Sequence, residues 1–480
     1  MITFNSAVQN QSARTTNDMK ARKSTANSCV DLFYKIGASR GKDIIPNFVA
    51  ALVEDEDIAL RIAQWARDVR GGAGERELFR QVLLYLEKHK PDLLIKILPK
   101  VPVIGRWDDL LIFESEDTRN LVYAMIKVEI YSGNQNQLMY KWLPREKSAK
   151  GSVAKELRKY LGISPKQYRK LLVESTNVVE TQMCNKDWDN INFSHVPSLA
   201  AARYKKAFYR NTEKFAEYVA ALVKGDDPKV KVNAGAVYPY DVLKGLISVY
   251  KTKELSTVEL DFVTQQWNAL ENFIGDANVL PLIDVSGSMT CSISADHSNT
   301  TSCLEVAVSL GLYCADKNKG KFNGTFLTFS GSPELVYLKG NIVEKIQQIN
   351  KSNWEMNTDL IKAMEKILSV AIEGNVSEEE MPEILLIFSD MQFDQCARFD
   401  DSAMEMIRRK FTESGYNVPK IVFWNLNAND NVPVKYNEKG VAMVSGFSPA
   451  IMKAILSCDM DDFTPESIMK QTVMQPRYDI

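Results

Sequence analysis

Three small oxygen-bearing side chains follow one another at two-residue spacing in the second half of the chain. Asp284, Ser286 and Ser288 come directly after the apolar run 279–283, whose β-branched residues and flanking turn formers predict a buried strand. A carboxylate and two hydroxyls on the loop that leaves a strand are hard oxygen donors, which suit Mg2+ or Mn2+. The alternative is that these side chains only cap the next helix.

Two later residues could complete such a site. Thr358 opens a predicted helical run, and Asp390 follows a second apolar run at 384–388. Asp-x-Ser-x-Ser, with a later Thr and Asp in this order, resembles the metal-ion-dependent adhesion site of von Willebrand factor A domains. The resemblance implies one divalent cation, Mg2+ or Mn2+, bound by Asp284, Ser286, Ser288, Thr358 and Asp390.

The elements that position these residues alternate between strand and helix. Short apolar runs predict strands at 279–283, 324–329, 334–337, 384–388 and 421–424, and most are separated by helical patterns. This alternation predicts a mostly parallel, doubly wound sheet with helices on both faces, which binds ligands at the carboxyl ends of its strands. We therefore expect a Rossmann-like von Willebrand factor A domain at 276–459, followed by a C-terminal tail at 460–480.

The first half of the chain shows a different pattern. Helical runs with short turns follow one another between residues 28 and 275, for example at 58–69, where apolar residues recur near the helical period. This succession predicts an α-helical repeat domain of the HEAT-like kind, in which neighbouring helices bury their apolar faces on one another. A polar arm at 1–27 precedes it. The expected fold class is α plus α/β.

The composition is that of a soluble globular protein. The chain has 480 residues, 45% of them hydrophobic and 25% charged, and no apolar run approaches the ~20 residues of a membrane span. Seven cysteines without paired spacing indicate reduced thiols, so we expect a cytoplasmic protein without a membrane anchor.

Charge is unevenly distributed. Residues 1–270 hold 41 Lys and Arg against 32 Asp and Glu, a balance of +9, whereas residues 271–480 hold 18 against 29, a balance of −11. The window 141–170 alone carries ten cations against two anions, with three aromatic residues between them. Clustered cations with aromatics suit a phosphate backbone with stacked bases, and the alternative is a solvated helical face. The candidate RNA-binding residues are Lys141, Arg145, Lys147, Lys155, Arg158, Lys159, Lys166, Arg169 and Lys170.

A helical array followed by an A domain resembles the Ro autoantigen (TROVE) architecture, and more closely a related family of unknown function. The resemblance is carried by the segments 67–76, 106–110, 183–188, 196–198, 388–394, 422–426 and 444–448. It implies a helical ring whose ends are joined by the A domain. It also implies binding of single-stranded RNA in the ring and of structured small RNA outside it, without catalysis.

Two functions remain open at this point. The first is a non-enzymatic RNA-binding protein of a ribonucleoprotein, with a divalent cation in its A domain. The second is a metal-dependent scaffold or adhesion module, in which a partner protein completes the metal shell. An enzyme is not expected, because the sequence offers no Ser-His-Asp set and no paired-carboxylate motif.

Overall fold

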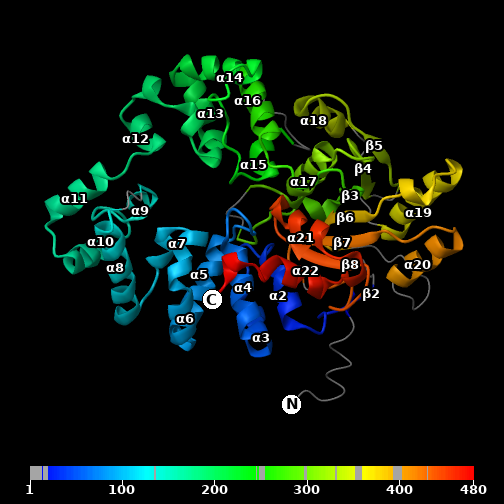
Figure 1. Ribbon diagram of the computed structural model, residues 1–480, viewed down its shortest axis with the longest axis horizontal. Coiled ribbons are helices and arrows are strands. Elements are labelled where there is room, and N and C mark those ends of the chain that lie inside the picture. Colours follow the sequence, from blue (N-terminus) through cyan, green and yellow to red (C-terminus); the bar gives the residue numbers. More distant parts are fainter. Residues whose placement is uncertain are drawn as a thin grey trace.

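The computed structural model describes most of the chain. The described residues are 13–14, 20–133, 137–244, 246–247, 255–296, 300–329, 332–351, 359–392, 403–429 and 431–480. Helices occupy the first half of this chain, and a sheet covered by helices occupies the second (Figure 1).

Helices alone build the first half after a short two-stranded pairing of β1 (Ala13–Arg14) with β2 (Lys20–Ala21). They are α2 (Ser28–Ile36), α3 (Ile45–Glu54), α4 (Glu56–Arg67), α5 (Arg76–His89), α6 (Pro91–Ile97), α7 (Val101–Ile104), α8 (Glu116–Tyr131), α9 (Gln137–Trp142), α10 (Gly151–Leu161), α11 (Pro165–Glu174), α12 (Val179–Cys184), α13 (Ser198–Asn211), α14 (Lys214–Lys224), α15 (Pro239–Leu243) and α16 (Thr257–Asn268). Between α2 and α16 the described residues contain no β-strand, so the expected helical first half is confirmed.

The glycine-rich stretch 70–76 is a tight turn between α4 and α5. The backbone N–H of Ala73 donates to the Trp65 carbonyl at 3.1 Å, which folds the turn back on the end of α4. A Cβ on Gly72 would lie 1.8 Å from that carbonyl oxygen, so only glycine fits there. The turn connects two helices and follows no strand.

The second half contains a six-stranded mixed sheet. Its strands are β3 (Val279–Asp284), β4 (Thr325–Phe329), β5 (Leu335–Tyr337), β6 (Ile384–Ser389), β7 (Lys420–Asn425) and β8 (Val441–Ser445). The spatial order is β5-β4-β3-β6-β7-β8, and every neighbouring pair is parallel except β4 with β5. Numbered within this half, the order is 3-2-1-4-5-6, that of a doubly wound sheet. The mostly parallel sheet was expected, whereas β8 was not predicted.

Alternate residues of the strands face two separate cores. On β6, Leu386 and Phe388 join the core that continues into the helical half, and Leu385 and Ile387 join a second core on the opposite face. The first face is covered by α17 (Cys303–Lys317), and the second by α19 (Leu360–Glu373) and α20 (Ala403–Glu413). Because both faces are buried, the strands read as continuous apolar runs.

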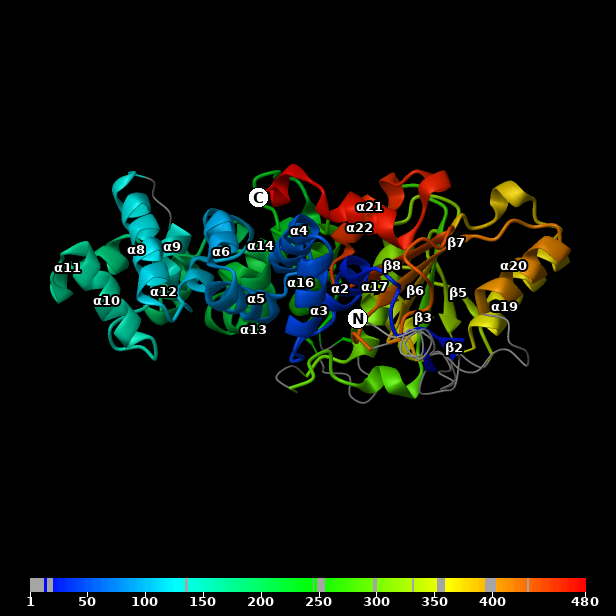
Figure 2. The same cartoon turned by 90° about the horizontal axis from the view of Figure 1, so that it is seen from below.

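The helical half starts and ends on the sheet half. Its first helix, α2, packs against β8, and Ser445 at the end of β8 donates its hydroxyl to the Phe33 carbonyl at 2.8 Å. Its last helices, α15 and α16, pack against α17 and α18 (Ile342–Lys351). In Figure 1 the helices between these two ends run outward through α8, α10 and α11 and return through α13 and α14. The turned view in Figure 2 shows that this arc is flat.

The last residues fold onto both halves. The segment expected as a C-terminal tail contains α22 (Pro465–Val473), which packs against β8 and α4, and a final turn in which Tyr478 is buried. Tyr478 and Arg477 both donate to the Asp68 carboxylate at the end of α4, the tyrosine hydroxyl at 3.0 Å. These bonds attach the segment 475–480 to the start of the helical arc. We call this segment the C-terminal strap.

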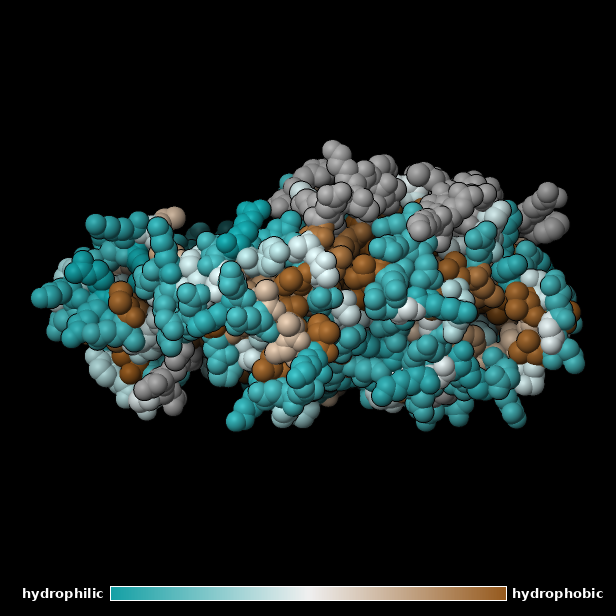
Figure 3. All heavy atoms as spheres, turned by 90° about the horizontal axis from the view of Figure 1, so that it is seen from above, coloured by the Kyte–Doolittle hydropathy of each residue, from teal (hydrophilic) through white to brown (hydrophobic). Residues whose placement is uncertain are grey.

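Hydrophilic side chains predominate on the face of the molecule in Figure 3, and apolar side chains lie there in separate patches. Among the described residues, no helix combines the length and the apolar character needed to cross a bilayer.

Candidate functional site

The predicted metal ligands lie where two neighbouring strands end. Asp284 is the last residue of β3, and Asp390 directly follows β6, the strand that pairs with β3 in parallel. In a sheet of this order the first and fourth strands diverge into helices on opposite faces, which opens a crevice at their carboxyl ends. The fold thus places both carboxylates at the position where doubly wound sheets bind ligands.

Four of the five predicted residues lie together in one cluster. The Ser286 N–H donates to Asp284 Oδ1 at 2.9 Å, and the Oγ atoms of Ser286 and Ser288 lie 3.0 Å apart. The Ser288 hydroxyl lies close enough to the Asp390 carboxylate to lower its pKa. Thr358 lies outside the described residues. We call Asp284, Ser286, Ser288 and Asp390 the carboxylate–hydroxyl cluster.

Both carboxylates are buried, and the pKa of each is raised above its ordinary value. Asp284 is 0% exposed, and burial together with the negative charge of Asp390 raises its pKa to about 7, against opposing hydrogen bonds from Ser389 and Ser286. Burial also raises the pKa of Asp390, which is 2% exposed. Neither carboxylate has a salt-bridge partner in the described part of the chain. Two buried, mutually repelling carboxylates beside two hydroxyls form a donor set that fits a hard divalent cation.

The structure adds residues that the sequence did not reveal. Ser389 donates its hydroxyl to Asp284 Oδ2 at 2.6 Å and accepts the Met391 N–H at 2.9 Å. Asn429, on the loop after β7, donates to the Asp390 carbonyl at 2.7 Å. The sequence feature that could have identified Ser389 is its position directly before a predicted ligand. Asn429 lies close to the cluster because of the order of the strands in the sheet, which no local sequence pattern indicates.

The basic window forms a groove at the far end of the helical arc. A cavity of about 480 Å3 lies between the residues before α10 and the start of α11. Its lining contains the cations Arg145, Lys147, Lys166 and Arg169, the acid Glu146, and the apolar side chains of Pro165, Tyr168, Leu172 and Val173. Tyr168 is buried, and its hydroxyl donates to the Pro144 carbonyl at 2.8 Å. We call this cavity the basic groove.

The four rim cations differ from other cations of the window. None of the four forms a salt bridge with any described residue, and all four are exposed. Lys141 pairs with Glu180 at 2.9 Å and Arg158 with Glu146 at 2.8 Å, so these two predicted RNA contacts are occupied within the protein. Lys170 pairs with Glu174 at 3.5 Å on the surface, and Lys155 and Lys159 are exposed on α10.

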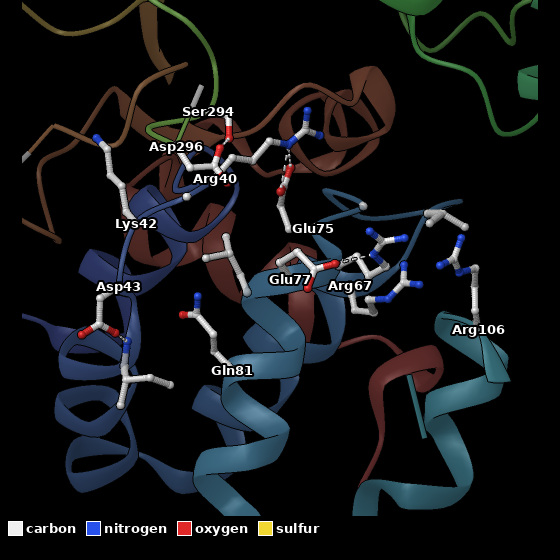
Figure 4. A pocket seen from close by; sticks show the side chains of 16 residues that line it. Arg40, Lys42, Asp43, Arg67, Glu75, Glu77, Gln81, Arg106, Ser294 and Asp296 are labelled. Atoms are coloured by element: carbon white, nitrogen blue, oxygen red, sulfur yellow. Dashed lines mark hydrogen bonds and ion pairs between the residues drawn. The ribbon is translucent and has the colours of Figure 1, made fainter. Parts of the chain in front are cut away.

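A second, larger cavity of about 770 Å3 lies between the helical half and the loop that follows the carboxylate–hydroxyl cluster (Figure 4). Its arginines are matched by acids. Arg40 pairs with Glu75 at 2.8 Å, and Arg67 with Asp109 at 2.7 Å. Arg106 pairs with Asp108 at 2.8 Å and stacks on Trp142. The arginines of this cavity are thus neutralised within the protein, whereas the four rim cations of the basic groove form no salt bridge with a described residue.

Comparisons with known proteins cover nearly the whole chain. The family model described as "Domain of unknown function (DUF2828)" matches residues 15–114 and 114–279, and "Domain of unknown function (DUF7788)" matches 278–477. "Uncharacterized protein L728" of Acanthamoeba polyphaga mimivirus is 31% identical over 521 residues, which cover 96% of this chain and 87% of that protein.

One solved structure extends over a similar share of the chain. The Ro (RSR) protein of Deinococcus radiodurans aligns over 93% of this chain and 99% of its own, with a TM-score of 0.38 and 13% sequence identity. A similarity of this degree does not establish a shared function.

Proposed function

The chain belongs to the DUF2828 family, and we propose that it is a non-enzymatic protein that binds single-stranded RNA in the basic groove and a divalent cation in its C-terminal half. The observation that supports RNA binding best is the convergence of four unpaired cations on one apolar-walled cavity. The C-terminal half, which would bind the cation, would be a domain of the von Willebrand factor A class.

The basic groove has the two parts that a single strand needs. Arg145, Lys147, Lys166 and Arg169 offer charge to consecutive phosphates, and their binding would release counterions. The exposed apolar side chains of Pro165 and Val173 offer a surface for a base. A groove of this kind binds with little sequence preference, because every base has an apolar face and every nucleotide a phosphate.

The carboxylate–hydroxyl cluster would hold Mg2+ or Mn2+ through Asp284, Ser286, Ser288 and Asp390, with Thr358 as a fifth ligand. A bound cation would neutralise the charge of the two buried carboxylates. It would also leave a coordination position open for an oxygen ligand from another molecule. The protein's own part is to hold the donors in place. Ser389 orients Asp284, and Asn429 fixes the backbone of Asp390.

A second candidate function is metal-dependent protein binding. Ser288 supports it, because this predicted ligand is exposed while Asp284 and Ser286 beside it are buried. The cluster therefore opens to the surface on the side of Ser288, where a carboxylate of a partner protein could complete the metal shell.

Fluorescence anisotropy with a labelled single-stranded RNA, measured over a range of salt concentrations, tests the first function. We expect the logarithm of the association constant to fall linearly with the logarithm of the salt concentration. The slope is set by the number of phosphates contacted. The same assay with EDTA separates the two functions. RNA binding at the groove should persist without the cation, whereas a metal-dependent protein partner should dissociate. Absence of RNA binding at low salt would leave protein binding as the function.

A further inference from the structure

Two cysteines face one another beside the carboxylate–hydroxyl cluster. Cys291 follows the short turn that carries Ser288, and Cys303 begins α17. Their sulfur atoms lie 3.5 Å apart, although they are separated by eleven residues in sequence. Neither the fold nor the proposed cation site requires this pair.

The backbone holds the two residues opposite one another. The Cys303 N–H donates to the Cys291 carbonyl at 3.0 Å, and the Ile293 N–H donates to the Thr301 carbonyl at 3.1 Å. These bonds flank an antiparallel bridge between Ser292 and Ser302. Opposed residues of antiparallel strands have Cα atoms about 4.5–5.5 Å apart. Disulfides span about 4.4–6.8 Å between Cα atoms, so side-chain rotation alone could close one here.

The two thiols differ in access and in surroundings. Cys303 is buried, whereas Cys291 is partly exposed and accepts a hydrogen bond on its sulfur from Asn427 Nδ2 at 3.4 Å. Cys291 is therefore the thiol that an outside reagent can reach, and Cys303 is held directly behind it.

We propose that Cys291 and Cys303 are a redox-reactive dithiol that closes a disulfide on exposure to a low-molecular-weight disulfide of the glutathione class. The Cys291 thiolate attacks one sulfur of the reagent, and the first thiol leaves as a mixed disulfide forms. Cys303 then gives up its proton and attacks the Cys291 sulfur, which expels the second thiol. One reagent disulfide is reduced to two thiols, and one protein disulfide forms.

Peptide mapping by mass spectrometry tests the proposal on the full chain. The reduced protein is incubated with oxidised glutathione, quenched with N-ethylmaleimide and digested. We expect a linked Cys291–Cys303 peptide pair in the wild type, and glutathione retained on Cys291 in the Cys303→Ser variant, because the second thiol is missing. In Cys291→Ser, Cys303 should stay unmodified, with alkylation at least about tenfold slower than that of Cys291 in the wild type.

Cys184 is the internal control, because it is exposed and should acquire glutathione in every sample. The proposal is overturned if Cys184 reacts while the wild type yields no linked pair. It is also overturned if Cys303→Ser carries no glutathione on Cys291. Thermal melting of each variant verifies that it is folded, and Cys303→Ala replaces Cys303→Ser if the serine variant melts early.

Discussion

Ser389 donates its hydroxyl to Asp284 Oδ2 at 2.6 Å, across the line where β3 and β6 end side by side. This bond joins two strands that lie 105 residues apart in the chain, and it satisfies one oxygen of a carboxylate that no cation of the described residues pairs with. The remaining charge on Asp284 and Asp390 is what a divalent cation would neutralise.

Removing that charge should abolish a metal response. We expect Mg2+ or Mn2+ at 100 times its Kd to stabilise the wild type by about 2.7 kcal/mol, since the cation binds only the folded state. Asp284→Asn should lose this gain while it keeps the size of the side chain. Differential scanning fluorimetry with metal and with EDTA measures the effect.

Asp276→Asn is the matched control, because Asp276 is exposed and lies just before β3. It should respond to metal as the wild type does. An equal response of Asp284→Asn and the wild type would exclude the cluster as the cation site.

The basic groove predicts which cations matter for RNA. Reversing three rim charges, Lys147→Glu, Lys166→Glu and Arg169→Glu, should weaken single-stranded RNA binding at least roughly tenfold. It should also flatten the salt slope by about one unit for each phosphate that the variant no longer neutralises. Anisotropy titrations at several salt concentrations give both quantities.

A triple reversal on α5, α6 and the residue between them controls for net charge. Lys88, Lys90 and Lys96 are exposed and lie away from the groove, so their change to Glu alters the total charge equally. If both triple variants weaken RNA binding by the same factor, the groove is not the binding site.

The C-terminal strap should contribute measurable stability. The Tyr478 hydroxyl donates to the buried Asp68 carboxylate at 3.0 Å, and a hydrogen bond to a charged group is worth about 1.5–3 kcal/mol. Tyr478→Phe keeps the buried ring and removes this bond, so its free energy of unfolding should fall by that amount. Urea denaturation measures it. Tyr209→Phe, on an exposed ring, should stay within about 0.5 kcal/mol of the wild type, and an equal loss in both variants would contradict the prediction.

Buried Lys205 predicts a pH dependence of stability. Burial lowers its pKa from 10.5 to about 8, although Glu259 opposes the shift. Between these two values the unfolded chain retains a proton that the folded protein has released, so this lysine makes stability rise with pH. The free energy of unfolding of the wild type, minus that of Lys205→Met, should increase by about 3 kcal/mol across this window.

Urea titrations at several pH values measure the free energy of unfolding of both proteins. Taking the difference cancels the contributions of the other titratable groups. Lys206→Met, one residue along and exposed, is the control and should show no such increase. A flat difference for Lys205→Met would mean that the lysine is solvated in the folded protein.

The sequence predicted what depends on local pattern. Apolar runs located β3, β4, β5, β6 and β7, and the polar residues at two strand ends identified the carboxylate–hydroxyl cluster. Strand β8 was missed although it is also a short apolar run, flanked by Gly440 and Gly446, and its burial depends on contacts with α2 and α22. The pairing of Lys141 with Glu180, 39 residues away, could not be predicted either, because this contact depends on how the helical arc folds and not on a local sequence pattern. The groove therefore uses only part of the basic window.

The Asp68–Arg477 contact spans 409 residues, which has a consequence for synthesis on the ribosome. At about 5–20 residues per second, the partner of Asp68 emerges some 20–80 s after Asp68 itself. During that time α4 carries a carboxylate at its end that cannot yet receive its final donors. Asp68 therefore obtains these two donors only after residues 477 and 478 have been synthesised.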